Sequence, residues 1–157
     1  MSQLPSQLVQ EFQHRYHRQP RLFRAPGRVN LIGEHTDYNG GFVFPAAIDR
    51  ATYVAIAPRD DQRLRAASLS LPETLDVPIG HRQPAGNWTD FITGVAALLD
   101  VQTGADLLIA TDIPIGGGLS SSAALTVSTA FALGTGTRTR QQIALLCQRA
   151  ENEFTGM

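Results

Sequence analysis

Apolar residues recur at helical spacing in three stretches of the chain, residues 4–17, 87–100 and 139–154. Their stripes are Leu4, Leu8, Val9, Phe12 and Tyr16; Trp88, Phe91, Ile92, Val95, Leu98 and Leu99; and Ile143, Leu146, Cys147, Ala150 and Phe154. Thr139 and Gln142 form a capping-box pattern before the last stripe. A fourth helix, rich in small residues, is predicted from about Leu119 to Leu133 and is ended by Gly134-Thr135-Gly136-Thr137.

Short apolar runs of β character lie between these helices. They are Val29–Ile32, Phe42–Phe44, Ala51–Ile56, Arg63–Ala67 and Ala105–Thr111. Asn39-Gly40-Gly41 predicts a tight turn between the first two runs, and residues 72–84 indicate an irregular connection. Because helices and strands are mixed without regular βαβ alternation, the predicted fold class is α+β.

The composition is that of a globular protein, with 43% hydrophobic residues, 17% charged residues and a net charge of -1. This balance gives no electrostatic footprint for nucleic acid or an anionic membrane, so neither is predicted as a partner. Cys147 is the only cysteine, which indicates a reducing compartment. With no signal-peptide pattern and no membrane-spanning apolar run, we expect a cytoplasmic protein.

All thirteen basic residues are arginines, and the chain contains no lysine. A Walker-type phosphate loop needs a lysine on the phosphates, and Schiff-base chemistry needs a lysine amine, so both are excluded. Any phosphate bound here must be held by arginine, backbone N–H groups, a helix N-terminus or a metal.

The loop Pro114-Ile115-Gly116-Gly117-Gly118-Leu119-Ser120-Ser121-Ser122-Ala123-Ala124 joins a predicted strand to a predicted helix. Adjacent glycines let backbone N–H groups converge on an anion, and serine hydroxyls can bind phosphate or Mg²⁺. The plain alternative is a flexible loop whose serines cap the helix. A dinucleotide-binding fingerprint fits worse because Ser121 occupies the third glycine position. A hydrolase elbow fails because no serine here has a glycine two residues later.

A second polar cluster holds Arg28, Glu34, His35 and Asp37 between glycines. A solvated hairpin tip would explain such charges, but their place at the end of apolar runs favours a ligand-binding site. Carboxylates with a histidine suit sugar hydroxyls better than a metal, because the other histidines are scattered. Glu151 lies at the edge of the last apolar stripe. It could be a structural carboxylate whose hydrogen bonds are satisfied, or a metal ligand.

Three segments together resemble the galactokinases, within the sugar and mevalonate kinase family that also includes homoserine kinases. The segments are Gly27–Tyr38, Pro114–Ala123 and Ala150–Gly156. The resemblance implies an α+β N-terminal kinase domain (ribosomal S5 domain 2-like) over residues 1–157. Its sugar-binding signature would be residues 27–41, and its ATP-phosphate loop residues 114–123.

The resemblance also implies phosphoryl transfer from ATP to the C1 hydroxyl of galactose, with Mg²⁺ as cofactor. The sequence does not determine the oligomeric state, and a monomer is our expectation. Arg28 would stabilise the transferring phosphoryl group, whose spread charge suits a guanidinium. The implied sugar-binding residues are Glu34, His35, Thr36 and Asp37. The implied nucleotide-binding residues are Gly116, Gly117, Gly118, Leu119, Ser120, Ser121 and Ser122, with Ser68 and Trp88 near the base. Ser122 and Glu151 would bind Mg²⁺. The helical stripe gives Trp88 an equally good role as a core anchor.

The family pattern also includes an aspartate a few residues beyond the position of Met157, a tyrosine of the sugar site and a C-terminal domain. We therefore expect the 157-residue chain alone to be very weakly active or inactive. Two alternatives stay open from the sequence. One is a non-catalytic module that senses galactose and ATP. The other is a kinase for a different small alcohol such as mevalonate, which the run Glu34–Asp37 disfavours because a largely apolar acid does not require those polar partners.

Overall fold

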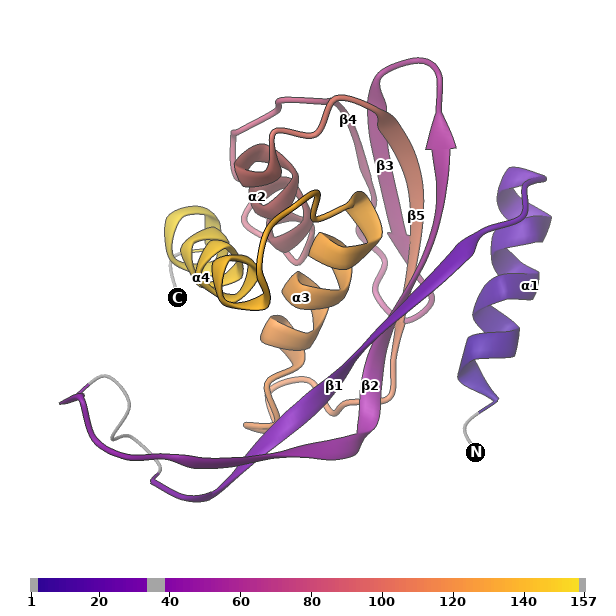
Figure 1. The fold of residues 1–157 in the computed structure, drawn as a ribbon. Helices are drawn as coiled ribbons and strands as arrows, with labels where there is room; N and C mark the ends of the chain where they lie inside the picture. The colour runs from indigo at the N-terminus through magenta and orange to yellow at the C-terminus, as the bar shows by residue number, and fades with distance from the viewer. Residues whose placement is uncertain (1–2, 34–38, 156–157) are drawn as a thin grey trace.

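The computed structural model describes residues 3–33 and 39–155. A five-stranded sheet in the order β1-β2-β5-β3-β4 forms its centre (Figure 1). The strands are β1 (Arg21–Ile32), β2 (Phe44–Arg59), β3 (Arg63–Ser68), β4 (Leu75–Pro78) and β5 (Gly104–Thr111). Neighbouring strands are antiparallel except β3 and β5, which run parallel.

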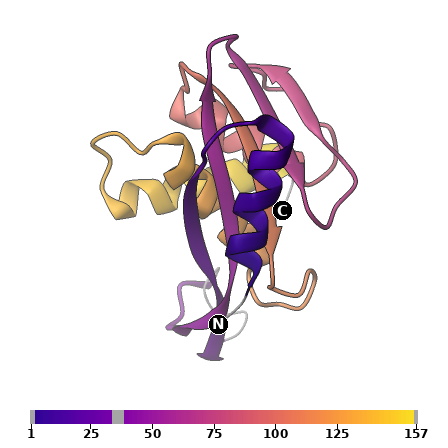
Figure 2. The ribbon, with the colours of Figure 1, turned by 90° about the vertical axis from the view of Figure 1, so that its right-hand side faces the viewer.

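Helices cover both faces of the sheet. They are α1 (Leu4–Tyr16), α2 (Thr89–Leu99), α3 (Ser121–Leu133) and α4 (Arg140–Ala150), and α4 continues into the π-helical turn η2 (Glu151–Thr155). Helices α2, α3 and α4 lie on one side of the sheet, and α1 lies alone on the other (Figures 1 and 2). The chain is therefore built in layers around one sheet, which confirms the predicted α+β class.

Strand β2 shows how one strand serves both layers. Successive side chains of a strand point to opposite faces. Val54 and Ile56 accordingly join the core under α2 and α3, while Tyr53 and Ala55 pack beneath α1. Residues Ala51 to Ala57 are all buried for this reason. The alternation expected of a half-exposed strand is therefore absent in this stretch, and the sequence reads as one continuous apolar run.

The predicted elements are largely present, with differences at the connections. The capping box of α4 is confirmed, with the Thr139 side chain accepting from the Gln142 N–H and the Gln142 side chain accepting from the Thr139 N–H. The expected strand Phe42–Phe44 is wrong in its first two residues, because β2 begins at Phe44 and pairs there with Ile32. Residues 72–84 are not wholly irregular, since β4 pairs with β3 inside them. Within the described residues, no helix is long and apolar enough to cross a membrane.

Candidate functional site

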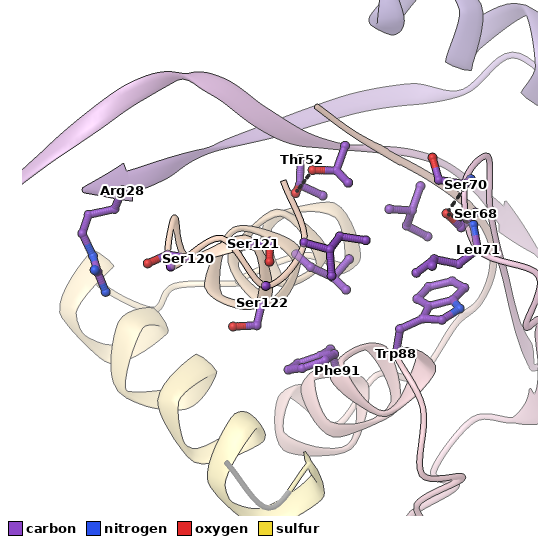
Figure 3. A pocket seen from close by; sticks show the side chains of 16 residues that line it. Arg28, Thr52, Ser68, Ser70, Leu71, Trp88, Phe91, Ser120, Ser121 and Ser122 are labelled. Atoms are coloured by element: carbon purple, nitrogen blue, oxygen red, sulfur yellow. Dashed lines mark hydrogen bonds between the residues drawn. The ribbon is translucent and has the colours of Figure 1, made fainter. Parts of the chain in front are cut away.

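A cavity of about 510 Å³ opens where β1, β5 and the N-terminus of α3 meet (Figure 3). Arg28 lies at one end of it and Trp88 at the other, with the serines of the α3 N-terminus between them (Figure 3). The full lining is Arg28, Thr52, Ser68, Ser70, Leu71, Trp88, Phe91, Ile109, Thr111, Ile115, Gly116, Gly118, Ser120, Ser121, Ser122 and Leu125. The cavity thus joins a charged and hydroxyl-rich end to an apolar end.

The glycine-serine loop is held at its start and exposed in its middle. Ile113 is buried with Ala25 and Ala124, which fixes the loop where it leaves β5. Gly116 and Gly118 then take φ angles of 74° and 69°, the left-handed conformation that glycine adopts without a steric penalty. Ser120 also adopts a positive φ, 60°, although it carries a side chain. Such backbone geometry in a non-glycine residue is common at ligand-binding sites.

Strand β1 brings Arg28 beside this loop through a backbone contact. The Arg28 N–H donates to the Leu119 carbonyl oxygen at 3.0 Å. The approach is close because Gly27 has no side chain: a Cβ there would lie 2.8 Å from the same carbonyl oxygen. The pairing of β1 with β2 also shifts register between Pro26 and Arg28. Residues some ninety positions apart in the sequence thereby form one wall.

Helix α3 presents its N-terminus to the cavity. Its N-cap residue, Ser120, makes no side-chain capping hydrogen bond. The N–H groups of a first helical turn have no partner inside the helix, and they carry the positive end of the helix dipole. With Ser121 and Ser122 on the cavity wall, this end can bind an anion such as phosphate.

Glu151 reaches the same end of α3 from η2. Its Oε2 accepts from the Ser122 hydroxyl at 3.4 Å, and its Oε1 accepts from the Thr126 hydroxyl at 3.0 Å. Burial raises the pKa of Glu151, while the hydrogen bonds from Thr126 and Ser122 act in the opposite direction. Glu153, two residues on, is exposed and pairs with Arg149 at 3.0 Å. Only the first of the two carboxylates therefore faces the site.

The Ser122 hydroxyl and the Glu151 carboxylate are a hard-oxygen pair of the kind that suits Mg²⁺. Within residues 3–33 and 39–155, no group of three or more His, Cys, Asp or Glu side chains could hold a metal. Mg²⁺ usually takes one or two protein oxygens and completes its shell with water and substrate phosphate. The donor set therefore fits Mg²⁺ held together with a phosphate, and does not resemble a zinc site.

Trp88 and Ser68 form the other end of the cavity. The Ser68 hydroxyl accepts from the N–H groups of Ser70 and Leu71 at 3.1 and 3.3 Å, which shapes the turn after β3. Trp88 sits just before α2 and also packs against the main core. Its two sequence interpretations, cavity residue and core anchor, are therefore compatible.

The segment before Trp88 is held by a buried carboxylate. Asp90, 3% exposed, accepts from the N–H groups of Ala85, Gly86 and Asn87 at 2.7, 2.7 and 3.2 Å. These bonds fold residues 85–87 around the first turn of α2. They fix the backbone that carries the indole into the cavity.

The structure brings most of the predicted site residues together. Arg28, Ser68, Trp88, Gly116, Gly118, Ser120, Ser121 and Ser122 line one cavity, and Glu151 contacts Ser122. Gly117 and Leu119 belong to the same loop but do not line the cavity. Glu34, His35, Thr36 and Asp37 lie outside the described residues, so their predicted role in sugar binding stays a prediction.

Sequence reasoning missed several residues of the cavity. Thr52 and Thr111 face each other across β2 and β5, with their hydroxyls 3.0 Å apart. This pairing depends on strand register, which no local pattern in the sequence encodes. The helical stripe predicts that Phe91 faces the core, but this residue lines the cavity. Thr126 had a detectable signal, because it follows Ser122 by four residues and so shares its helix face.

Two family profiles match the chain in the regions that build this site. The "Galactokinase galactose-binding signature" matches residues 10–58, and the "GHMP kinases N terminal domain" matches residues 90–157. The first region supplies the second half of α1, β1 and most of β2, and the second supplies nearly all of α2 with β5, α3, α4 and η2.

Comparison with individual sequences also finds galactokinases. The chain is 49% identical over 146 residues to the galactokinase of Chloroflexus aggregans, covering 87% of this chain and 37% of that protein. It is 47% identical over 161 residues to the galactokinase of Roseiflexus sp., covering 96% of this chain and 41% of that protein. The chain thus spans well under half the length of these relatives.

Solved structures share the fold. Lactococcus lactis galactokinase, crystallised with galactose, superposes with a TM-score of 0.88 at 32% identity, covering 98% of this chain and 43% of that one. Methanococcus jannaschii mevalonate kinase gives a TM-score of 0.74 at 25% identity, covering 88% of this chain and 48% of that one.

With this fold and these family matches, the chain belongs to the GHMP kinases. Within that family it corresponds to the N-terminal part of the galactokinases.

Proposed function

We propose that this chain contributes galactokinase function: it holds ATP and galactose for transfer of the γ-phosphate to the C1 hydroxyl of the sugar. One observation carries the proposal. Arg28, the glycine-serine loop, Ser68 and Trp88 come from separate parts of the sequence and line a single cavity. The relatives described above are galactokinases, which supports galactose over mevalonate as the acceptor.

The phosphates of ATP would lie at the N-terminus of α3. There the loop N–H groups and the helix dipole favour negative charge, and the hydroxyls of Ser120, Ser121 and Ser122 can donate to phosphate oxygens. Gly117 and Leu119 would serve through the shape of the loop backbone. The apolar end of the cavity, with Ser68 and Trp88, would take the base.

Arg28 would stabilise the phosphoryl group during transfer. Catalysis of phosphoryl transfer is mostly positioning and electrostatic stabilisation, and a permanently charged guanidinium suits charge spread over several oxygens. Glu34, His35, Thr36 and Asp37 follow β1 in the sequence, and we propose that they bind the sugar hydroxyls. Ser122 and Glu151 would hold Mg²⁺, which when bound neutralises charge on the phosphates.

Calorimetry on the 157-residue chain tests the binding part of this proposal. We expect saturable binding of ATP with Mg²⁺, and saturable binding of galactose, both at or below millimolar concentration. Absence of saturable binding for either ligand would overturn the proposal.

A pair of arginine variants sharpens the test. Arg28→Ala should weaken binding of ATP with Mg²⁺ by roughly tenfold, since a lost charge-assisted contact costs about 1.5–3 kcal/mol and solvent replaces part of it. Arg24 lies on the same strand, donates to the Asp49 carbonyl oxygen at 3.0 Å and does not line the cavity. Arg24→Ala is therefore the matched control and should bind as the parent does. Equal losses in the two variants would contradict the assignment of Arg28.

A further inference from the structure

Thr126 is a completely buried residue of α3 whose hydroxyl faces Glu151. Its exposed fraction is 0%, and its Oγ1 lies 3.0 Å from Glu151 Oε1 and 2.7 Å from the Ser122 carbonyl oxygen. A buried hydroxyl is costly unless it is hydrogen-bonded, and the single hydrogen of this one is shared between the two acceptors, which together restrict its orientation. Because residues four apart lie on one helix face, Thr126 sits one turn below Ser122.

The two oxygens of Glu151 are held unequally. The Thr126 contact at 3.0 Å is within the normal range for a hydroxyl donor, whereas the Ser122 contact at 3.4 Å is beyond it. The carboxylate is therefore anchored through Oε1 by Thr126. Its Oε2 and the Ser122 hydroxyl are the weakly engaged pair, and Ser122 lies on the cavity wall.

The backbone of Glu151 is fixed separately. Its carbonyl accepts from the Thr155 hydroxyl at 2.7 Å, and Phe154 of the same π-helical turn packs against Gly94 of α2. A Cβ at Gly94 would lie 2.9 Å from the Phe154 ring. With the backbone held by this packing, the remaining freedom of Glu151 is in its side chain, and Thr126 is the residue that restricts it at Oε1.

From this geometry we infer that Thr126 is a positioning residue. It holds the Glu151 carboxylate so that Oε2 stays beside the Ser122 hydroxyl, as a preformed pair of oxygens for the Mg²⁺ that accompanies ATP. The inference rests on the proposed function, in which Ser122 and Glu151 bind that metal. Residues that orient metal ligands in this way commonly change metal affinity by about 10- to 100-fold when they are removed.

The chain offers a matched control in the same helix. Thr129 is also 0% exposed, and its hydroxyl has no hydrogen-bond partner among the described residues. Thr126→Val and Thr129→Val each replace one buried hydroxyl by a methyl group of similar size. Only the first substitution removes a contact to Glu151.

The test is calorimetric titration of the 157-residue chain with ATP, once with Mg²⁺ and once with EDTA. We expect Thr126→Val to weaken binding in Mg²⁺ by about tenfold and to change binding in EDTA by less than about twofold. Thr126→Ser keeps the hydroxyl and should restore the Mg²⁺ effect, and Thr129→Val should match the parent. In a Glu151→Gln background, Thr126→Val should cause no further loss, because the group it positions is gone.

The outcomes separate the two proposals. If the parent binds ATP but Thr126→Val binds it equally well in Mg²⁺, or loses affinity equally in EDTA, the positioning role is overturned and the proposed function stands. If the parent binds no ATP under either condition, both are overturned. Thermal unfolding verifies that each variant is folded. If Thr126→Val does not fold, Thr126→Ala replaces it in the same titrations.

Discussion

At the residue scale, Glu151 lies in the candidate site, and burial of its charged carboxylate lowers the stability of the fold. Burial raises the pKa of its carboxyl above the ordinary value of 4.5. A raised pKa in the folded state means that the neutral form is favoured by folding. The stabilisation that comes from burying the neutral carboxyl is present in full below the pKa of the unfolded state. It is lost as the pH rises through the pKa of the folded state. Near neutral pH the carboxylate therefore opposes folding unless a cation compensates it.

We predict that Glu151→Gln, in the absence of Mg²⁺, has a higher free energy of unfolding than the parent at pH 7, with the difference shrinking towards pH 4. Denaturant unfolding across this pH range measures it. Glu153→Gln is the control: its exposed pair with Arg149 should contribute no more than about 1 kcal/mol and should not produce this pH trend. A Glu151→Gln variant that is less stable than the parent at pH 7, and equal to it at pH 4, would contradict the account.

Gly27 is a residue whose position leaves no room for a side chain. A Cβ there would lie 2.8 Å from the Leu119 carbonyl oxygen, 3.0 Å from Ile48 Cδ1 and 3.2 Å from Ile113 Cδ1. We predict that Gly27→Ala lowers the free energy of unfolding by roughly 1–3 kcal/mol, the usual cost of overpacking. It should also weaken ATP binding, since β1 and the loop must separate.

Gly117→Ala provides the comparison for Gly27→Ala. Gly117 is exposed and has no left-handed φ, and its nearest neighbour would be Pro114 Cβ at 3.3 Å. Denaturant unfolding should show a smaller loss for this variant. Similar losses at the two positions would mean that the contact between β1 and the loop does not limit the fold.

At the element scale, α4 and η2 carry Glu151 to α3. The helix begins at the capping box of Thr139 and Gln142 and buries Ile143, Cys147 and Ala150 against α2 and α3. Burial, with a smaller effect of Glu151, raises the pKa of Cys147 to about 11. The thiol is thus protected by burial and by its protonation, and it reacts only when α4 opens.

We predict that Thr139→Ala destabilises the start of α4 by about 1 kcal/mol, the typical cost of losing such a cap. The rate of Cys147 alkylation near neutral pH should rise about fivefold, because 1 kcal/mol corresponds to that factor in the open population. Mass spectrometry of timed iodoacetamide reactions measures it, and Thr139→Ser should restore the parent rate. Equal rates in the alanine variant and the parent would show that Cys147 is exposed by a different motion.

The same elements show what the sequence could predict. The α4 capping box and its apolar stripe are local patterns, so both were read correctly from neighbouring residues. The predicted end of β1 at Ile32 is confirmed, but the predicted start of β2 at Phe42 is wrong, because Phe42 and Val43 have β character and lie outside the pairing. Local propensity cannot decide this point, since strand ends depend on the partner strand.

At the scale of the whole molecule, the site depends on contacts between distant segments. The resemblance to a known family identified Arg28, Ser122 and Glu151 as site residues. It did not predict the contacts that bring them together. The Arg28 N–H to Leu119 bond, the Thr52–Thr111 pair and the anchoring of Glu151 by Thr126 all follow from how the layers pack. The cavity is lined by residues of the sheet, of α2 and of the loop that leads into α3.

The central claim is that ATP occupies the cavity between Arg28, the glycine-serine loop and Trp88. Trp88 is the only tryptophan in the chain, and its side chain lines that cavity, so its fluorescence is a direct probe of this site. The most direct measurement is a titration of intrinsic fluorescence with ATP in Mg²⁺, for the parent and for Glu151→Gln. The account predicts a saturable change in the parent that shifts to at least about tenfold higher ATP concentration in the variant. A signal that stays constant while calorimetry detects ATP binding would contradict it, because ATP would then bind elsewhere.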